Sequence, residues 1–204
     1  LGDRRSNVVV AFFDQPNATN WTQYVVAPSP FSQSEPAVVV GNGVALVVWT
    51  QNRDRLGNET AILGALLPMT GARTGAQPFV VRDVISTIEQ HPAVSYRNGV
   101  FSVAYQSINA VDYIQVLEAD GGLQNQVNVA PGPNTDRPQI ASLSATTDVV
   151  TWTDIGVPKR MKYATVTGTT VTQRGNLAGS RINNLDQYAL ALTGTTAGAT
   201  ASWQ

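Results

Sequence analysis

The chain contains no cysteine, and this absence removes several kinds of chemistry at once. In a sequence of 204 residues it excludes disulfide bonds, thiol nucleophiles and thiolate metal sites. Histidine is nearly absent as well, since His91 is the only one, and no Gly-x-Ser-x-Gly sequence occurs. A hydrolase built on a Ser–His–Asp triad is therefore poorly supported.

Charged residues are also scarce, at 13% of the chain against roughly a quarter in a typical protein. The net charge is −1 and only Lys159 and Lys162 are lysines, so no basic run exists to neutralise a phosphate backbone. This argues against nucleic acid as a partner. The longest apolar runs, such as residues 44–49, are far too short to span a bilayer.

The chain is instead rich in uncharged residues, namely valine, threonine, alanine, glycine, asparagine and glutamine. This composition is typical of a β-rich protein with a neutral polar surface. No segment keeps an apolar period of about 3.6 residues, and the best helical candidate is the short segment 84–90. We therefore expect strands and almost no helix.

A strand–turn–strand pattern that closes on an aromatic residue occurs four times. The period is roughly 50 residues, which predicts stacked, self-similar β-units, and the aromatic residues are Trp49, Tyr105, Trp152 and Trp203. We interpret them as packing residues that fill the wedge between neighbouring units, with a sugar-stacking ring as the alternative. Three of the patterns open on a proline, which we interpret as the first residue of a strand: Pro36, Pro92 and Pro138.

The unit around Asn98-Gly99 shows the pattern most clearly, because Asn-Gly between two apolar runs is a strong hairpin signal. Two more strands complete that unit, at 113–117 and 125–130. Residues 7–13 and 21–26 match the last two strands of a unit, and residues 187–204 match the first two.

These patterns predict an all-β fold, a β-propeller of about four four-stranded antiparallel blades in a single domain. The predicted parts are a half-blade at 1–33, blades at 34–90, 91–136 and 137–186, and a half-blade at 187–204. Closure of a four-bladed ring would pair residues 199–203 with 8–12. The alternative is a segment of a larger propeller. The chain begins at Leu1 without a signal-peptide pattern, which is compatible with a processed mature protein or with a piece of a longer one.

The recurring motifs also resemble those of a known kind of repeat. A proline-led strand, an Asn-Gly turn, Val-x-Trp-Thr, the segment 118–122 (Glu-Ala-Asp-Gly-Gly) and the Val-Asn-Val strand at 127–129 resemble β-propeller-like repeats of large secreted bacterial proteins. The size and the four units are similar to haemopexin-type four-bladed domains, although the closing disulfide and the repeated Asp-Ala strand starts of those domains are missing. The resemblance implies an extracellular or cell-surface propeller and brings no catalytic residues.

The long connections carry most of the charge, and in an up-and-down blade they emerge on one face. Long polar loops on a rigid scaffold are where binding usually takes place. The candidate binding residues on this face are Arg53, Asp54, Asp83, Asp136, Arg137, Asp154, Arg181 and Asp186.

The main functional prediction is a non-catalytic extracellular module that presents these loops to a protein or a glycan, alone, as an oligomer or within a parent assembly. One alternative is a glycan-active hydrolase that uses a pair of loop carboxylates, although no spacing selects two of them. The other is a structural fragment of a larger surface assembly. We predict no catalytic residue, no metal site and no cofactor, with an axial cation held by backbone carbonyls as an alternative.

Overall fold

The computed structural model describes residues 6–13, 21–70, 76–108, 110–156, 159–182, 191–195 and 198–202. This part of the chain forms sixteen β-strands and no helix, which confirms the predicted all-β fold. The proposed helical segment is instead a turn with irregular flanks, between β6 and β7. Within the described residues there is accordingly no helix that is long and apolar enough to cross a membrane.

The strands form three four-stranded antiparallel sheets, or complete blades, flanked by two two-stranded sheets. The first complete blade holds β3 (Gln33–Gly41), β4 (Val44–Asn52), β5 (Thr60–Pro68) and β6 (Phe79–Arg82). The second holds β7 (Gln90–Arg97), β8 (Val100–Ser107), β9 (Ala110–Leu117) and β10 (Leu123–Pro131). The third holds β11 (Thr135–Ser142), β12 (Thr147–Asp154), β13 (Lys159–Thr167) and β14 (Thr170–Ile182).

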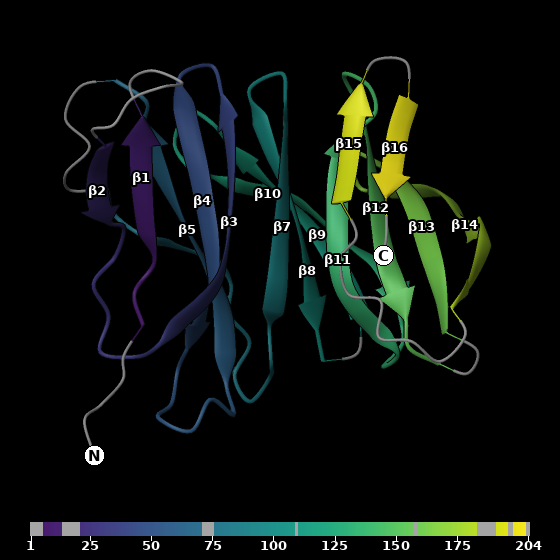
Figure 1. Cartoon of the computed structure of the whole chain (residues 1–204), viewed down its shortest axis with the longest axis horizontal. Coiled ribbons are helices and arrows are strands. Elements are labelled where there is room, and N and C mark those ends of the chain that lie inside the picture. The colour runs from purple at the N-terminus through teal and green to yellow at the C-terminus, as the bar shows by residue number, and fades with distance from the viewer. Residues whose placement is uncertain are drawn as a thin grey trace.

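The two-stranded sheets are β1 (Val9–Phe13) with β2 (Trp21–Val25) and β15 (Ala191–Thr195) with β16 (Gly198–Ser202). The predicted order of a half-blade, three complete blades and a half-blade is therefore confirmed. The blades stand side by side across the molecule in Figure 1, where β3, β7 and β11, the first strands of the complete blades, run in the same direction.

The predicted pairing of the two half-blades is wrong for the residues that the structure describes. There β1 pairs with β2 alone, β16 pairs with β15 alone, and no ladder joins the two sheets. In Figure 1 the β1–β2 sheet lies at the opposite side of the molecule from β15 and β16. Residues 8–12 and 199–203 both lack charged side chains, but such a lack is common in strands with a buried face, so it does not identify a partner.

The recurring aromatic residues fill the wedges between blades, as predicted. Trp49 and Tyr105 are fully buried and Trp152 is 4% exposed, while Trp203 lies outside the described residues. Trp49 belongs to a hydrophobic cluster that joins β1 and β2 to the first complete blade through Val8 and Phe12. Burial of such large apolar surfaces is the main force that holds one blade against the next.

A buried polar network crosses the interface between the second and third blades. The carboxylate of Asp148, on β12, is fully buried and accepts hydrogen bonds from Ser102 Oγ at 2.7 Å, Tyr113 Oη at 2.7 Å and Ser142 Oγ at 2.8 Å. Arg97 Nε donates to the same carboxylate at 3.1 Å. Burial, followed by the charge of Asp148, raises the pKa of Tyr113 to about 12, so its hydroxyl stays a donor. The network satisfies a charge that would otherwise be costly to bury.

The prediction that three prolines start their strands is wrong by two or three residues. Each first strand begins upstream of its proline and contains a register shift there, between Ser34 and Ala37, Gln90 and Ala93, and Asp136 and Gln139. Proline has no N–H for the ladder, so pairing is interrupted at that point. A β-bulge then lets the ladder resume on the other side.

Candidate functional site

The bulges place one residue of each first strand in an unusual backbone conformation. Glu35, His91 and Arg137 directly precede the three prolines, and their φ angles are 53°, 52° and 47°. A positive φ is uncommon for residues other than glycine and stores strain that functional sites often use. The repeat therefore holds a charged residue in a strained conformation at the same end of three successive blades.

Two of these residues meet in a cluster of charged side chains. His91 Nε2 lies 2.8 Å from Glu35 Oε1, and His91 Nδ1 lies 3.5 Å from Asp136 Oδ1. The backbone N–H of His91 also donates to Glu35 Oε2 at 2.9 Å. Because Glu35 belongs to β3, His91 to β7 and Asp136 to β11, each complete blade contributes one member.

Both nitrogens of the His91 ring face oxygen acceptors. Glu35 lies on Nε2, while Gln106 Oε1, at 2.8 Å, and Asp136 share Nδ1. Only the doubly protonated imidazolium can donate on both sides. Burial alone would lower the pKa of His91, but the hydrogen bonds to Glu35 and Gln106 and the charges of Glu35 and Asp136 raise it above 6.5.

The partners of Glu35 act in the opposite direction on its carboxyl group. Burial would raise its pKa, but hydrogen bonds from the side chain and backbone of His91, the charge of that ring and a 2.9 Å bond from Thr50 Oγ1 lower it to about 2. The cluster thus holds an ionised carboxylate beside a cationic imidazolium. All these groups remain partly accessible, with exposed side-chain fractions of 35% for Glu35, 19% for His91 and 18% for Asp136.

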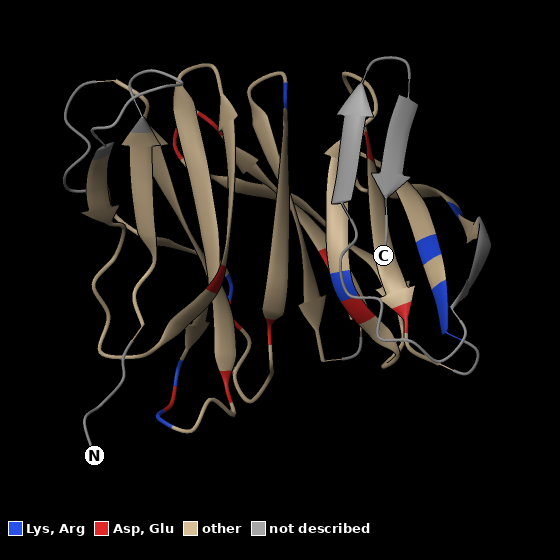
Figure 2. Ribbon diagram, in the orientation of Figure 1, with Lys and Arg blue, Asp and Glu red and all other residues tan. Residues whose placement is uncertain are grey.

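Figure 2 shows that charged residues gather at the lower end of the blades, where the first strands begin and the long loops emerge. The structure brings Asp136 and Arg137, two of the predicted site residues, to this cluster, with Arg137 Nε 3.9 Å from Asp136 Oδ2. The other predicted site residues that the structure describes do not lie in this cluster.

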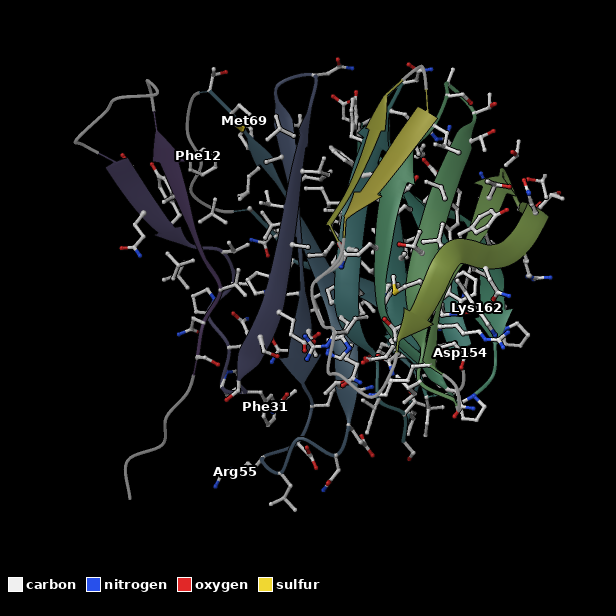
Figure 3. All side chains as sticks on the ribbon, turned by 45° about the vertical axis from the view of Figure 1, so that its right-hand side comes forward. Phe12, Phe31, Arg55, Met69, Asp154 and Lys162 are labelled. Carbon is white, nitrogen blue, oxygen red and sulfur yellow. The ribbon has the colours of Figure 1, made fainter. Side chains whose placement is uncertain are left out.

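Those candidates form separate pairs and turns. Arg53 forms an ion pair with Asp83. Asp154 forms one with Lys162, which is labelled next to it in Figure 3. Asp54 Oδ1 accepts a hydrogen bond from the backbone N–H of Asn58 at 2.9 Å within its own loop. The Arg181 backbone pairs with Arg160, whereas Asp186 lies outside the described residues.

Sequence reasoning missed Glu35 and treated His91 only as evidence against a catalytic triad. A usable signal exists, because the residue before the strand-leading proline is charged or ionisable in all three units, as Glu35-Pro36, His91-Pro92 and Arg137-Pro138. The positive φ angles were not predictable from it, because proline favours an extended backbone in the residue before it.

The cluster is not arranged as a metal centre. Within the described part of the chain, no group of three or more His, Asp or Glu side chains could hold a metal ion. The reason is visible in the contacts, because the two carboxylates lie on opposite nitrogens of His91 and do not converge on one point. The axial cation held by backbone carbonyls stays a prediction.

Another acidic residue, outside the cluster, is buried directly before β7. Glu89 is only 2% exposed, and its Oε2 has no hydrogen-bond partner among the described residues. Its other oxygen accepts a bond from Thr87 Oγ1 at 3.1 Å. Burial raises the pKa of Glu89 to about 7, although Thr87 and the charge of Arg82 oppose the shift. This carboxyl group is enclosed in the interface between the first and second blades, away from solvent.

We expect Glu89 to make the protein less stable as the pH rises. A carboxyl group with a raised folded-state pKa contributes its full stability below its unfolded value of 4.5 and loses it as the pH rises through about 7. The free energy of unfolding should fall by about 2–3 kcal/mol between pH 4.5 and pH 8 from this group alone. Urea unfolding of the wild type and of Glu89→Gln at both pH values measures the difference, with Glu59→Gln as the surface control. Parallel pH profiles for wild type and Glu89→Gln would contradict the assignment.

Comparison of the sequence finds no matching family model and no matching curated protein. The resemblance to haemopexin-type domains and to repeats of secreted bacterial proteins therefore has no support beyond the propeller-like fold itself.

Comparison of the structure finds glycoside hydrolases. The catalytic domain of Coprinopsis cinerea GH62 alpha-L-arabinofuranosidase aligns with a TM-score of 0.50 and 10% identity over 74% of this chain and 54% of its own. A thermostable family-43 glycoside hydrolase aligns with a TM-score of 0.50 and 8% identity over 81% of this chain and 64% of its own. Trypanosoma rangeli sialidase, in complex with 2,3-difluorosialic acid, aligns with a TM-score of 0.57 and 13% identity over 97% of this chain and 37% of its own.

At such low identity the likeness shows a shared propeller-like fold, and the chain spans less than two thirds of each of these structures. The predicted non-catalytic binding module is nevertheless corrected by this finding. The reported structures of this fold are glycoside hydrolases, which favours the alternative prediction of a glycan-active hydrolase over the main one.

Proposed function

We propose that this chain is a hydrolytic domain that cleaves glycosidic bonds, with Glu35 and Asp136 as its pair of carboxylates and His91 as the proton donor to Asp136. The observation that carries the proposal is the meeting of these three groups at the same end of β3, β7 and β11. Strained backbone beneath Glu35 and His91 adds support, since such strain concentrates at active sites.

The spacing of the two carboxylates supports a single displacement by water. They are separated by the width of an imidazole ring with a 2.8 Å contact on one side and a 3.5 Å contact on the other. Because this ring lies between them, we expect the two carboxylates to be farther apart than the roughly 5–5.5 Å of enzymes that form a glycosyl-enzyme intermediate. The sugar and the attacking water would bind on the solvent-facing side of the ring, in the wider arrangement of roughly 6.5–9.5 Å that inverts the anomeric centre.

The protonation states suggest a role for each group. Glu35 is ionised and takes the proton of the attacking water as general base. The imidazolium of His91 passes its Nδ1 proton to Asp136, which protonates the leaving oxygen. Glu35 then releases its proton to solvent, and the vacant Nδ1 of His91 takes one up from solvent, since both side chains are partly exposed. One water is consumed, one glycosidic bond is cleaved and the cluster regains its starting protonation.

We expect Glu35→Gln and Asp136→Asn each to lower kcat by about 100- to 10,000-fold, the usual contribution of a general acid or base. Release of nitrophenol from a panel of aryl glycosides, including arabinofuranosides, xylosides and sialosides, measures the effect. Proton NMR of the first product formed should show inversion of the anomeric configuration.

Asp54→Asn is a matched control, because Asp54 lies on the same face but outside the cluster. Its activity should stay within about twofold of the wild type, since surface changes away from a site are usually small. Full activity in Glu35→Gln or Asp136→Asn, or absence of any glycosidase activity in the wild type, would overturn the proposal.

A hydrolase of polymeric glycans works where its substrate is displayed, so we also propose an extracellular or cell-surface location and a glycan as the partner. Recovery of the protein from the culture medium or cell-surface fraction of its source, and not from the cell interior, is the expected result.

A further inference from the structure

A cavity separate from the Glu35–His91–Asp136 cluster lies in the wedge where the third blade meets the loop that follows β10. Its volume is about 400 Å³, within the roughly 300–1,000 Å³ of small-molecule sites. Glu35, His91 and Asp136 are not among its lining residues. The walls come from the loop 131–134 and from one face of the third blade, including Trp152, Asp154, Lys162, Arg174 and Asn176.

Strand register explains why polar side chains meet on this wall. Lys162 is directly opposite Trp152 on one side and Asn176 on the other, and Asp154 is opposite Arg160. Lys162 forms an ion pair with Asp154, and Arg174 Nε donates to the backbone oxygen of Val129 at 2.9 Å. Two cationic side chains, Lys162 and Arg174, therefore line the cavity together with a single carboxylate, Asp154. Figure 2 shows the basic residues of β13 as blue bands.

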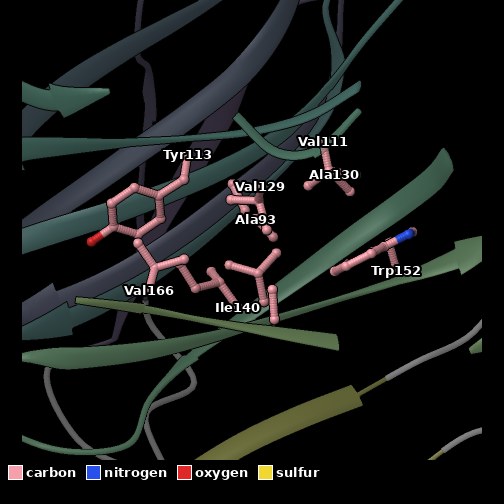
Figure 4. Packing of buried hydrophobic residues seen from close by; sticks show 11 residues of the cluster. Ala93, Val111, Tyr113, Val129, Ala130, Ile140, Trp152 and Val166 are labelled. Atoms are coloured by element: carbon pink, nitrogen blue, oxygen red, sulfur yellow. The ribbon is translucent and has the colours of Figure 1, made fainter. Parts of the chain in front are cut away.

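The indole of Trp152 adds an aromatic side chain to the wall. The side chain is 96% buried, since only 4% of the residue is exposed. In Figure 4 its nitrogen end points away from the hydrophobic cluster around Ile140 and Val129. Trp152 lies in the wall of the cavity, so a ligand oxygen bound there could accept a hydrogen bond from its N–H.

An equivalent cavity of about 410 Å³ lies beside the first complete blade. It too is lined by an ion pair, that of Arg53 and Asp83. In the middle of its wall, however, Leu63 stands opposite Trp49, in the position of Lys162, and Val80 stands in the position of Asn176. The third blade therefore differs by a cation and an amide where the first blade has two apolar side chains, and this difference points to a polar ligand.

We propose that this cavity binds a carboxylated sugar, such as a hexuronate unit of an acidic polysaccharide. Lys162 and Arg174 would hold the sugar carboxylate, Asp154 and Asn176 would bind hydroxyl groups, and the Trp152 N–H would donate to a ring or hydroxyl oxygen. A phosphate group fits less well, because its second charge would lie beside Asp154. The choice of a sugar rests on the proposed function, whereas the acidic character rests on the cationic side chains.

Calorimetric titration with trigalacturonate and with the neutral galactotriose tests this inference. The wild type should bind the acidic trisaccharide at least tenfold more tightly, and the difference should shrink in high salt. Lys162→Gln and Asn176→Tyr should each weaken the binding of trigalacturonate at least tenfold, the first by removing charge and the second by filling the cavity. Arg55→Gln, an exposed cation on another loop (Figure 3), should bind like the wild type.

Equal affinity for the acidic and neutral sugars, or unchanged affinity in Asn176→Tyr with an unchanged melting temperature, would overturn the inference. The Glu35→Gln variant separates the two proposals. If it binds trigalacturonate with wild-type affinity while lacking hydrolysis, both stand. Hydrolysis by a wild type that binds no acidic sugar rejects the cavity assignment alone, and binding without any hydrolysis rejects the proposed function alone.

Discussion

Replacement of Asp148 by alanine should lower the free energy of unfolding by about 3–5 kcal/mol, the usual cost of removing one partner of a buried ion pair. The Asp148 side chain is fully buried and that of Arg97 is 11% exposed, so solvent cannot replace the lost contacts. Arg97 would keep its charge, and Ser102, Tyr113 and Ser142 would lose their shared acceptor. Urea unfolding followed by tryptophan fluorescence measures the change.

A double-mutant cycle identifies the source of this loss. If Arg97 and Asp148 stabilise each other, Arg97→Ala together with Asp148→Ala should cost less than the sum of the two single changes by about 0.5–3 kcal/mol. Asp54→Ala, a change in a surface loop, serves as the control and should stay within about 0.5 kcal/mol of the wild type. A cost below about 1 kcal/mol for Asp148→Ala would show that the network does not hold the two blades together.

The second large effect is expected at Trp49, where alanine should lower the free energy of unfolding by about 3–5 kcal/mol. The side chain is fully buried and packs against Val8 and Phe12 of the half-blade and against Leu67 of the first complete blade. Deleting it opens a cavity at the contact between the two sheets. Thermal and urea unfolding measure the cost.

The matched change Trp49→Phe should cost clearly less than Trp49→Ala. The indole nitrogen of Trp49 has no hydrogen-bond partner among the described residues, so phenylalanine removes some volume but breaks no bond. If Trp49→Phe and Trp49→Ala lose the same stability, the loss would have to be explained by a polar contact of the indole and not by its packing. An unchanged melting temperature in Trp49→Ala would contradict the assignment of this residue to the blade interface.

Much of the fold could be predicted because its signals are local. The turn at Asn98-Gly99 has φ angles of 45° and 78°, which only a few residue types adopt readily. The aromatic residues at the same place in each unit indicated equivalent environments, and Trp49, Tyr105 and Trp152 are indeed all buried. The order of complete and half blades followed from these repeats.

The candidate site could be predicted only in part, because its members are distant in the sequence. Asp136 was selected for its place in a long loop, but its contact partner His91 and the further member Glu35 lie in other blades. Asp83 and Asp154 were selected in the same way as Asp136, but they do not join the cluster. Asp83 forms an ion pair with Arg53, and Asp154 forms one with Lys162. No sequence pattern distinguishes these outcomes.

By itself the sequence determined the strands, their turns and their grouping into blades, since these depend on residue alternation and on turn residues within a few positions. Tertiary structure alone decided which charged groups meet. The bulges in β3 and β7 hold Glu35 and His91 at positive φ, and the packing of neighbouring blades then sets the distance from His91 to Asp136. That distance arises from contacts between blades, which no local pattern in the chain encodes.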